Sequence, residues 1–94
     1  MANALKIHAT DNVAVALTNL QSGTRIALVE DGTDRDICAI DPIPFGHKIA
    51  LTRIPRGAVV IKYGAPIGLA REEIDAGQHV HVHNLESVRG AALS

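Results

Sequence analysis

Three histidines at alternate positions near the C-terminal end of the chain are the residues best suited to chemistry. They lie in the run His79-Val80-His81-Val82-His83-Asn84. On a β-strand the three imidazoles would project from one face, and the two valines from the other face into the core. Neutral imidazole is a common ligand of Zn, Fe and Ni ions. The run therefore predicts contact with a metal ion or a substrate; the alternative is a solvent-facing strand whose histidines bind nothing.

Two other polar clusters accompany this run. His47 and Lys48 directly follow a predicted tight turn, where side chains are exposed and held in place by rigid neighbours. Lys48 can pair with a substrate carboxylate, or it is a solvated surface lysine. His8 lies close to Asp11 and Asn12 in a predicted strand-to-turn position, where we expect the acidic and amide side chains to cap the turn.

The elements that position these residues are introduced by a recurring four-residue phrase. Each copy has an apolar anchor, two spacer residues and then Gly. Pro in the second place presets φ for a type I turn, and Gly tolerates the positive φ that commonly follows. Each copy therefore predicts a tight turn that leads into a strand. The copies are residues 20–23, 43–46, 54–57 and 74–77.

Short segments rich in β-branched residues favour strands over helices. Residues 13–17 form either a strand or a short helix, and residues 70–74 at most one helical turn. Gly64 and Gly68 predict sharp bends or close backbone approach. The polar segment 30–36 predicts a hairpin tip. The fold is thus predicted to be mainly β, with short strands, tight glycine turns and at most one or two short helices. The other predicted strands are 5–8, 25–29, 48–51, 58–63 and 79–83.

The 94 residues are enough for one domain only, since globular domains usually have ~50–200 residues. We expect its core in residues 5–85, and a tail at 86–94 that either frays or docks on a partner. A domain of this size has little stability to spare for a deep internal cavity. A complete active site formed by this chain alone is therefore not expected.

Composition argues against several partners. The formal net charge is −1 and the only aromatic residues are Phe45 and Tyr63, so we expect no binding of nucleic acid. No apolar run approaches the ~18 residues that span a bilayer, and residues 1–6 lack the features of a secretory signal. We therefore expect a cytoplasmic protein without a membrane partner. The single Cys38 excludes an intrachain disulfide, and we expect it to be a small buried side chain.

Four motifs follow one another along the chain: KIH with DNVAVAL (6–17), GHKIAL (46–51), IKYG with IG (61–68), and Gly77 followed by HVHNL (81–85). They stand in the order seen at the N-terminal end of altronate and galactarate dehydratases. The chain resembles the SAF (antifreeze-like) domain of that family, from about Leu5 to Leu85, which implies a fold of β-clip type. The ordered set is far more specific than any one motif. The acidic connection from Glu30 to Ile43 is the one departure from the family's pattern.

The resemblance implies a metal-dependent lyase. Members of the family remove water from a hydroxy acid, and the related sulfolactate sulfo-lyase removes sulfite. The chain would be a hydro-lyase component that acts on a sugar acid in carbohydrate metabolism, together with a large dehydratase-like catalytic subunit. Because the chain stops near Ser94, we expect the separate small-subunit arrangement. The implied cofactor is a divalent metal, with iron (Fe2+) first and Mn2+ or Zn2+ as alternatives.

The expected chemistry is abstraction of a proton α to a carboxylate, a metal ion that stabilises the enediolate, and loss of the β-substituent. The principal base is expected on the large subunit. This chain either donates metal ligands or only covers the site. The candidate residues are His81 and His83 for the metal, Asn84 and His8 for the substrate, and His47 and Lys48 for catalysis.

Two other functions fit the same residues. A non-catalytic module would use the histidine face to bind a metal ion or an acid sugar. A purely structural domain would drive homo-oligomerisation through exposed strand edges, which a short β chain must cover. In that case, loss of His81 and His83 would leave the activity of the partner intact.

Overall fold

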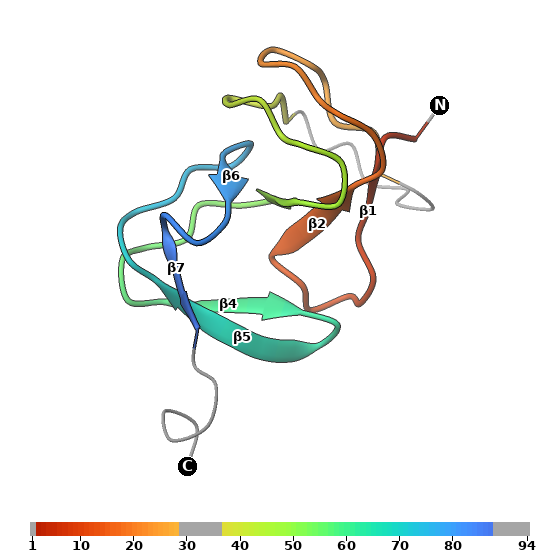
Figure 1. Ribbon diagram of the computed structural model, residues 1–94. Helices are drawn as coiled ribbons and strands as arrows, with labels where there is room; N and C mark the ends of the chain where they lie inside the picture. Colours follow the sequence, from red (N-terminus) through yellow and green to blue (C-terminus); the bar gives the residue numbers. More distant parts are fainter. Residues whose placement is uncertain (1, 29–36, 88–94) are drawn as a thin grey trace.

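The computed structural model describes residues 2–28 and 37–87, which form two antiparallel sheets and contain no helix, hence none that could cross a membrane. The first sheet has the strand order β1-β2-β3-β6, and the second β4-β5-β7. In Figure 1 the β4–β5 hairpin lies below the first sheet, and β7 runs beside β5. The prediction of a mainly β fold is confirmed. The strands are β1 (Ala4–Leu5), β2 (Val13–Ala16), β3 (Lys48–Ala50), β4 (Val59–Lys62), β5 (Ala65–Ala70), β6 (His79–Val80) and β7 (Leu85–Ser87).

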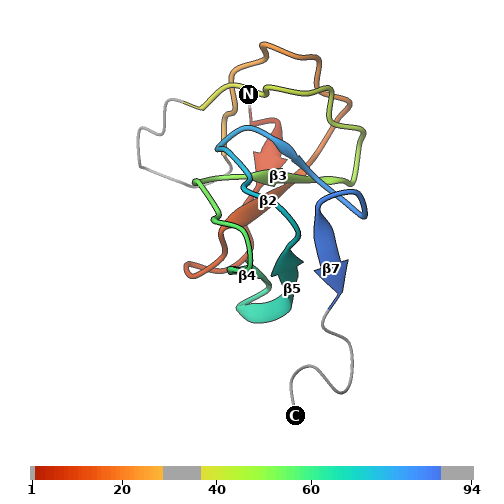
Figure 2. The ribbon, with the colours of Figure 1, turned by 90° about the vertical axis from the view of Figure 1, so that its left-hand side faces the viewer.

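The central strands β2 and β3 lie between two apolar clusters, and Figure 2 shows them side by side above β4 and β5. Ile49 packs in the first cluster and its neighbour Ala50 in the second. A strand buried on both faces is apolar throughout, which explains the apolar run Val13–Ala16. Of the two predicted alternatives for this segment, the structure has the strand and not the short helix. The first cluster contains Ala4, Ala14, Ala16, Leu20, Ile26, Ile37, Ala39, Ile43, Ile49 and Leu51. The second contains Val13, Ala50, Ile54, Val60, Ala70, Ile74 and Val80.

The four recurring phrases form turns with one common hydrogen bond. In each, the N–H after the glycine donates to the carbonyl of the second residue of the phrase, at 2.9 to 3.0 Å. The glycine is thus the third residue of the turn, and its φ is 83° to 91°. Positive φ at that place is typical of type II turns, so the turns are confirmed but the predicted type I geometry is wrong. The buried anchors form two bridges, Leu20 with Ile43 and Ile54 with Ile74.

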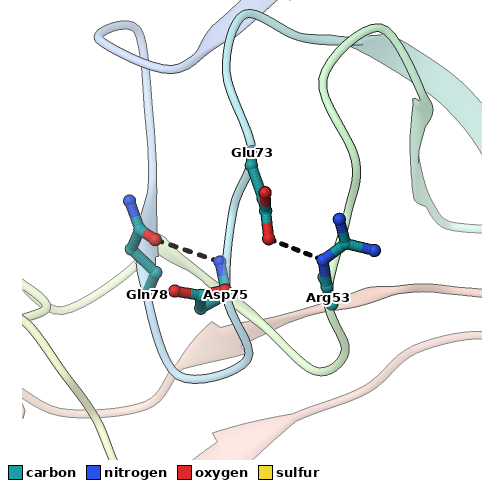
Figure 3. Close-up of polar contacts among 4 residues, drawn as sticks. All are labelled: Arg53, Glu73, Asp75 and Gln78. Atoms are coloured by element: carbon teal, nitrogen blue, oxygen red, sulfur yellow. Dashed lines mark hydrogen bonds and ion pairs between the residues drawn. The ribbon is translucent and has the colours of Figure 1, made fainter.

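The loops around the second bridge also meet on the surface. Arg53 Nε and Glu73 Oε2 lie 2.6 Å apart, and the side-chain oxygen of Gln78 accepts the backbone N–H of Asp75 at 3.0 Å (Figure 3). The hydrogen bond and the charge of Arg53 lower the pKa of Glu73. Both side chains of the ion pair are more than half exposed, so water screens their attraction.

Cys38 is exposed, and the prediction of a buried thiol is therefore wrong. Its neighbours Ile37 and Ala39 both pack in the first cluster, so alternation along the extended chain turns the side chain between them outward. The backbone of Cys38 forms an isolated bridge with Arg25.

Four other segments differ from the predicted elements or cannot be compared with them. In the described part of 25–29, isolated bridges take the place of the predicted strand. Residues 70–74 form no helical turn, because residue 70 ends β5 and residue 74 already pairs with Ile54. The predicted hairpin tip at 30–36 and residues 88–94 of the predicted tail lie outside the described residues.

Candidate functional site

A cluster of histidines lies where β3 meets β6, and it joins two distant parts of the sequence. In this antiparallel ladder Ile49 pairs with His79. One step further in the same register, His47 stands opposite His81. Their rings stack with centroids 4.2 Å apart and planes inclined by 18°. The cluster is therefore built across two strands and not along one.

Three of these histidines form a compact group, which we call the three-histidine group: His47, His79 and His81. The Nδ1 of His47 and the Nε2 of His79 are 2.9 Å apart. One ligand nitrogen from each of the three lies within 4.8 Å of the others, and all three residues are half-buried. His83 stands at the margin, with its ring centroid 5.3 Å from that of His79. The structure thus brings His81 together with His47, and His79 joins them.

The turn that follows β6 fixes this arrangement. Asn84 is fully buried; its side-chain oxygen accepts the N–H of His81 at 2.9 Å, and its amide donates to the carbonyl of His79 at 2.8 Å. Val80 lies in the strand and is buried, whereas Val82 lies beyond the end of the strand and is 73% exposed. The prediction that both valines face the core is therefore wrong for Val82. A substrate contact through Asn84 stays a prediction; in the structure its amide positions the histidines.

The surroundings favour the neutral form of two of the rings, those of His79 and His81. Burial lowers the pKa of His79, the charges of the neighbouring histidines lower it further, and Asp41 raises it by less. Burial likewise lowers the pKa of His81, again with help from neighbouring positive charges. Metal ions bind imidazole only in its neutral form, so the lowered pKa values of His79 and His81 favour metal binding by these two rings.

Comparison with known proteins assigns the family. The family model described as the altronate/galactarate dehydratase SAF domain matches residues 2–88. The chain belongs to this family. The match includes both strands that carry the histidines, so the resemblance noted from the motifs is confirmed along almost the whole chain.

Curated relatives show how the SAF domain is used elsewhere. It is 50% identical over 80 residues to altronate dehydratase of Escherichia coli strain K12, and 41% identical over 87 residues to altronate dehydratase of Bacillus subtilis strain 168. These matches cover 85% and 93% of this chain but only 15% and 17% of those enzymes. The (2R)-sulfolactate sulfo-lyase subunit alpha of Paracoccus pantotrophus is 39% identical over 62 residues, which are 66% of this chain and 92% of that subunit. The SAF domain thus corresponds to a small part of long dehydratases and to most of a short lyase subunit.

Lys48 lies next to the group in sequence, but alternation along β3 turns its side chain to the other face, toward the side of Ala50 and Val80. Burial lowers the pKa of Lys48, and the charge of Lys62 lowers it further. No carboxylate among residues 2–28 and 37–87 forms an ion pair with either lysine. The SAF domain therefore holds two neighbouring cations that an anion would stabilise.

Asp11 holds the β4–β5 turn against the start of β2 and does not belong to the three-histidine group. Its carboxylate accepts the N–H of Gly64 at 2.8 Å, of His8 at 3.0 Å and of Tyr63 at 3.1 Å. The side chain of Asn12 bonds to β4 in a similar way. The capping interpretation is confirmed for Asp11, whereas the side chain of Asn12 bonds to a strand and caps no turn. His8 is exposed, and a substrate contact through it stays a prediction.

The three-histidine group fits the kind of metal that the family implies. Three half-buried nitrogen donors lie within reach of one ion, and no carboxylate belongs to the group. Imidazole suits Fe and Zn, whereas Mn2+ prefers oxygen ligands. The donor set therefore favours iron or zinc over manganese.

The sequence did not single out His79 as a ligand, and only the family resemblance, not a pattern in the residues, connected His47 with His81 and His83. A signal was present, because both strands follow the same turn phrase: His47 comes directly after the phrase 43–46 and His79 two residues after 74–77. Asp41, whose carboxylate accepts the N–H of His79 at 3.0 Å, was also missed. It lies just before Pro42, in a segment without any periodic pattern.

Proposed function

We propose that this SAF domain is the small β-rich component of a hydroxy-acid lyase of the altronate/galactarate dehydratase type, which eliminates water from a sugar acid together with a larger catalytic region. The observation that carries the proposal is the three-histidine group, presented by a domain of the dehydratase family. The apolar cavity of about 340 Å3 near Leu20 and Ile43 contains none of these histidines. We infer that a surface of the catalytic region encloses them.

The chain's own residues would bind and orient the substrate in this complex. A divalent metal, when bound, would stabilise the negative charge that develops when the proton α to the carboxylate is removed. His47, His79 and His81 would hold that ion. Lys48, whose side chain lies on the other face of β3 with Lys62 nearby, has no described acidic partner and would attract an anionic group of the catalytic region. The base that removes the proton would lie on the catalytic region.

A second candidate reaction is the elimination of sulfite from a sulfonated hydroxy acid. It is favoured by the relative whose name is (2R)-sulfolactate sulfo-lyase subunit alpha, of which the match covers 92%. The two reactions share proton abstraction α to a carboxylate and differ in the leaving group. The same site can therefore be tested with both kinds of substrate.

Reconstitution tests the proposal. The chain is co-expressed with the catalytic region of an altronate dehydratase that has been deleted for its own SAF domain, and elimination is followed with altronate, galactarate and sulfolactate. We expect no turnover by the chain alone or in substrate-free controls, and turnover of one substrate class by the pair. Full activity of the catalytic region without the chain would overturn the proposal.

A further inference from the structure

We propose that His47, His79 and His81 form a site for one divalent first-row transition ion within the SAF domain itself, so that the domain binds the ion without the catalytic region. This inference deepens the proposed function, because it assigns the whole of the ion's protein ligands to this chain and has them bind the ion before any catalytic region is present. It concerns binding alone, so it can fail while the proposed function holds.

The first support is the way the ring nitrogens face one another. The Nδ1 of His47 and the Nε2 of His79 are 2.9 Å apart. At this distance either one nitrogen carries a proton and donates it to the other, or both nitrogens present lone pairs to a cation that they share. Each neutral ring can move its proton to its other nitrogen, which frees both facing nitrogens for an ion. No residue of the described ranges hydrogen-bonds a ring nitrogen of His81, so a third lone pair is free.

The second support is the rigid backbone beneath the three rings. The N–H of His79 donates to Asp41 and its carbonyl accepts from Asn84, which also accepts the N–H of His81. The N–H of His47 donates to a turn carbonyl, and its own carbonyl accepts from β2. Ligands whose backbone is fixed on both sides lose little freedom when an ion binds, which raises affinity.

The third support is the distance that remains to be closed. A tetrahedral zinc ion with Zn–N bonds of about 2.0 Å needs ligand nitrogens about 3.3 Å apart. The nitrogens of the group already lie within 4.8 Å of one another, and the pair formed by His47 and His79 is closer than required. The nitrogens therefore need to move by no more than about 2 Å, a distance that rotation of side chains can supply.

The donor set also defines the class of ion. Three imidazoles without a carboxylate suit Zn2+, Co2+, Ni2+ or Fe2+, and they do not suit Mg2+ or Ca2+, which require oxygen ligands. Three protein ligands leave at least one coordination position open, as in catalytic zinc sites. That position could accept an oxygen of a hydroxy acid.

Titration of the isolated 94-residue chain with Co2+ and Zn2+ tests the inference. We expect one ion per chain, with the absorption bands of Co2+ bound to nitrogen ligands. His47→Ala, His79→Ala and His81→Ala should each weaken binding at least about tenfold. His8→Ala and His83→Ala should leave the affinity unchanged within about twofold, since neither ring belongs to the group.

A measurement on the unchanged chain keeps the test valid if a variant does not fold. Small amounts of Co2+ should shift or broaden the ring NMR signals of the three histidines before that of His8. The inference is overturned if no ion saturates the chain, or if His8→Ala weakens binding as much as His79→Ala, which would show dispersed surface binding. It is also overturned if His83→Ala removes binding and His47→Ala does not.

Discussion

The carboxylate of Asp11 accepts the backbone N–H of Gly64 at 2.8 Å, although 53 positions separate the two residues. The same carboxylate binds two further backbone N–H groups and is only 5% exposed. Removing a buried acceptor leaves its donors without partners, at about 1–3 kcal/mol. We expect Asp11→Ala to lower the free energy of unfolding by that amount in urea denaturation. Asp75→Asn, at an exposed turn, should change it by less than about 0.5 kcal/mol.

Acid should weaken the same contact. Burial raises the pKa of Asp11, but the hydrogen bonds from Gly64, His8 and Tyr63 outweigh burial and bring the pKa below its ordinary value of 3.8. Because the folded-state pKa is depressed, the contribution of Asp11 to stability is complete above that ordinary value and is lost as the pH falls through the folded value. The unfolding free energy of Asp11→Asn should therefore fall less steeply below pH 3.8 than that of the unchanged chain. Parallel curves would show that the carboxylate is not the titrating group.

Gly77 and Gly23 allow a matched comparison of two turns. Both have a φ of +91°, where any residue with a Cβ is strained by about 1–2 kcal/mol. A Cβ at Gly77 would lie 2.0 Å from the carbonyl oxygen of Cys38, whereas a Cβ at Gly23 would meet nothing within 4 Å. Gly77→Ala should thus destabilise the domain by about 1–3 kcal/mol more than Gly23→Ala. Equal losses in thermal or urea unfolding would contradict the close approach of these loops.

The exposed pair of Arg53 and Glu73 should contribute little to stability despite its short distance (Figure 3). Water and salt screen the attraction, and both long side chains lose freedom when they pair. Glu73→Gln should leave the midpoint of urea unfolding unchanged within error, at low and at high salt. In contrast, Ile74→Ala, at a fully buried anchor of the neighbouring bridge, should cost about 2–5 kcal/mol.

Local features of the fold could be predicted from the sequence. The four turn phrases carry their own glycines and anchors, so both the turns and the strands 48–50 and 59–62 follow from nearby residues. Gly68 was expected at a close approach, and a Cβ there would lie 2.4 Å from the carbonyl oxygen of Glu86. The buried run Val13–Ala16 was ambiguous because burial on both faces removes the alternation that separates strand from helix.

Features that depend on strand pairing could not be predicted in the same way. The partnership of His47 and His79 across 32 positions requires the register of β3 with β6, and no local pattern encodes it. The end of β6 at Val80 depends on Asn84, whose buried amide forms the following turn. For the same reason the exposure of Val82 was missed, while the gathering of the histidines on one side was anticipated.

The central claim is that the histidines of the SAF domain act in a lyase reaction that a larger catalytic region completes. It is tested most directly by kcat/KM for elimination from the sugar acid in the reconstituted complex, with His79→Ala compared to Glu73→Gln. Both substituted side chains belong to the SAF domain, but only His79 lies in the three-histidine group. The account predicts a loss of at least about tenfold for His79→Ala and none for Glu73→Gln. Equal activity of the two complexes would contradict it.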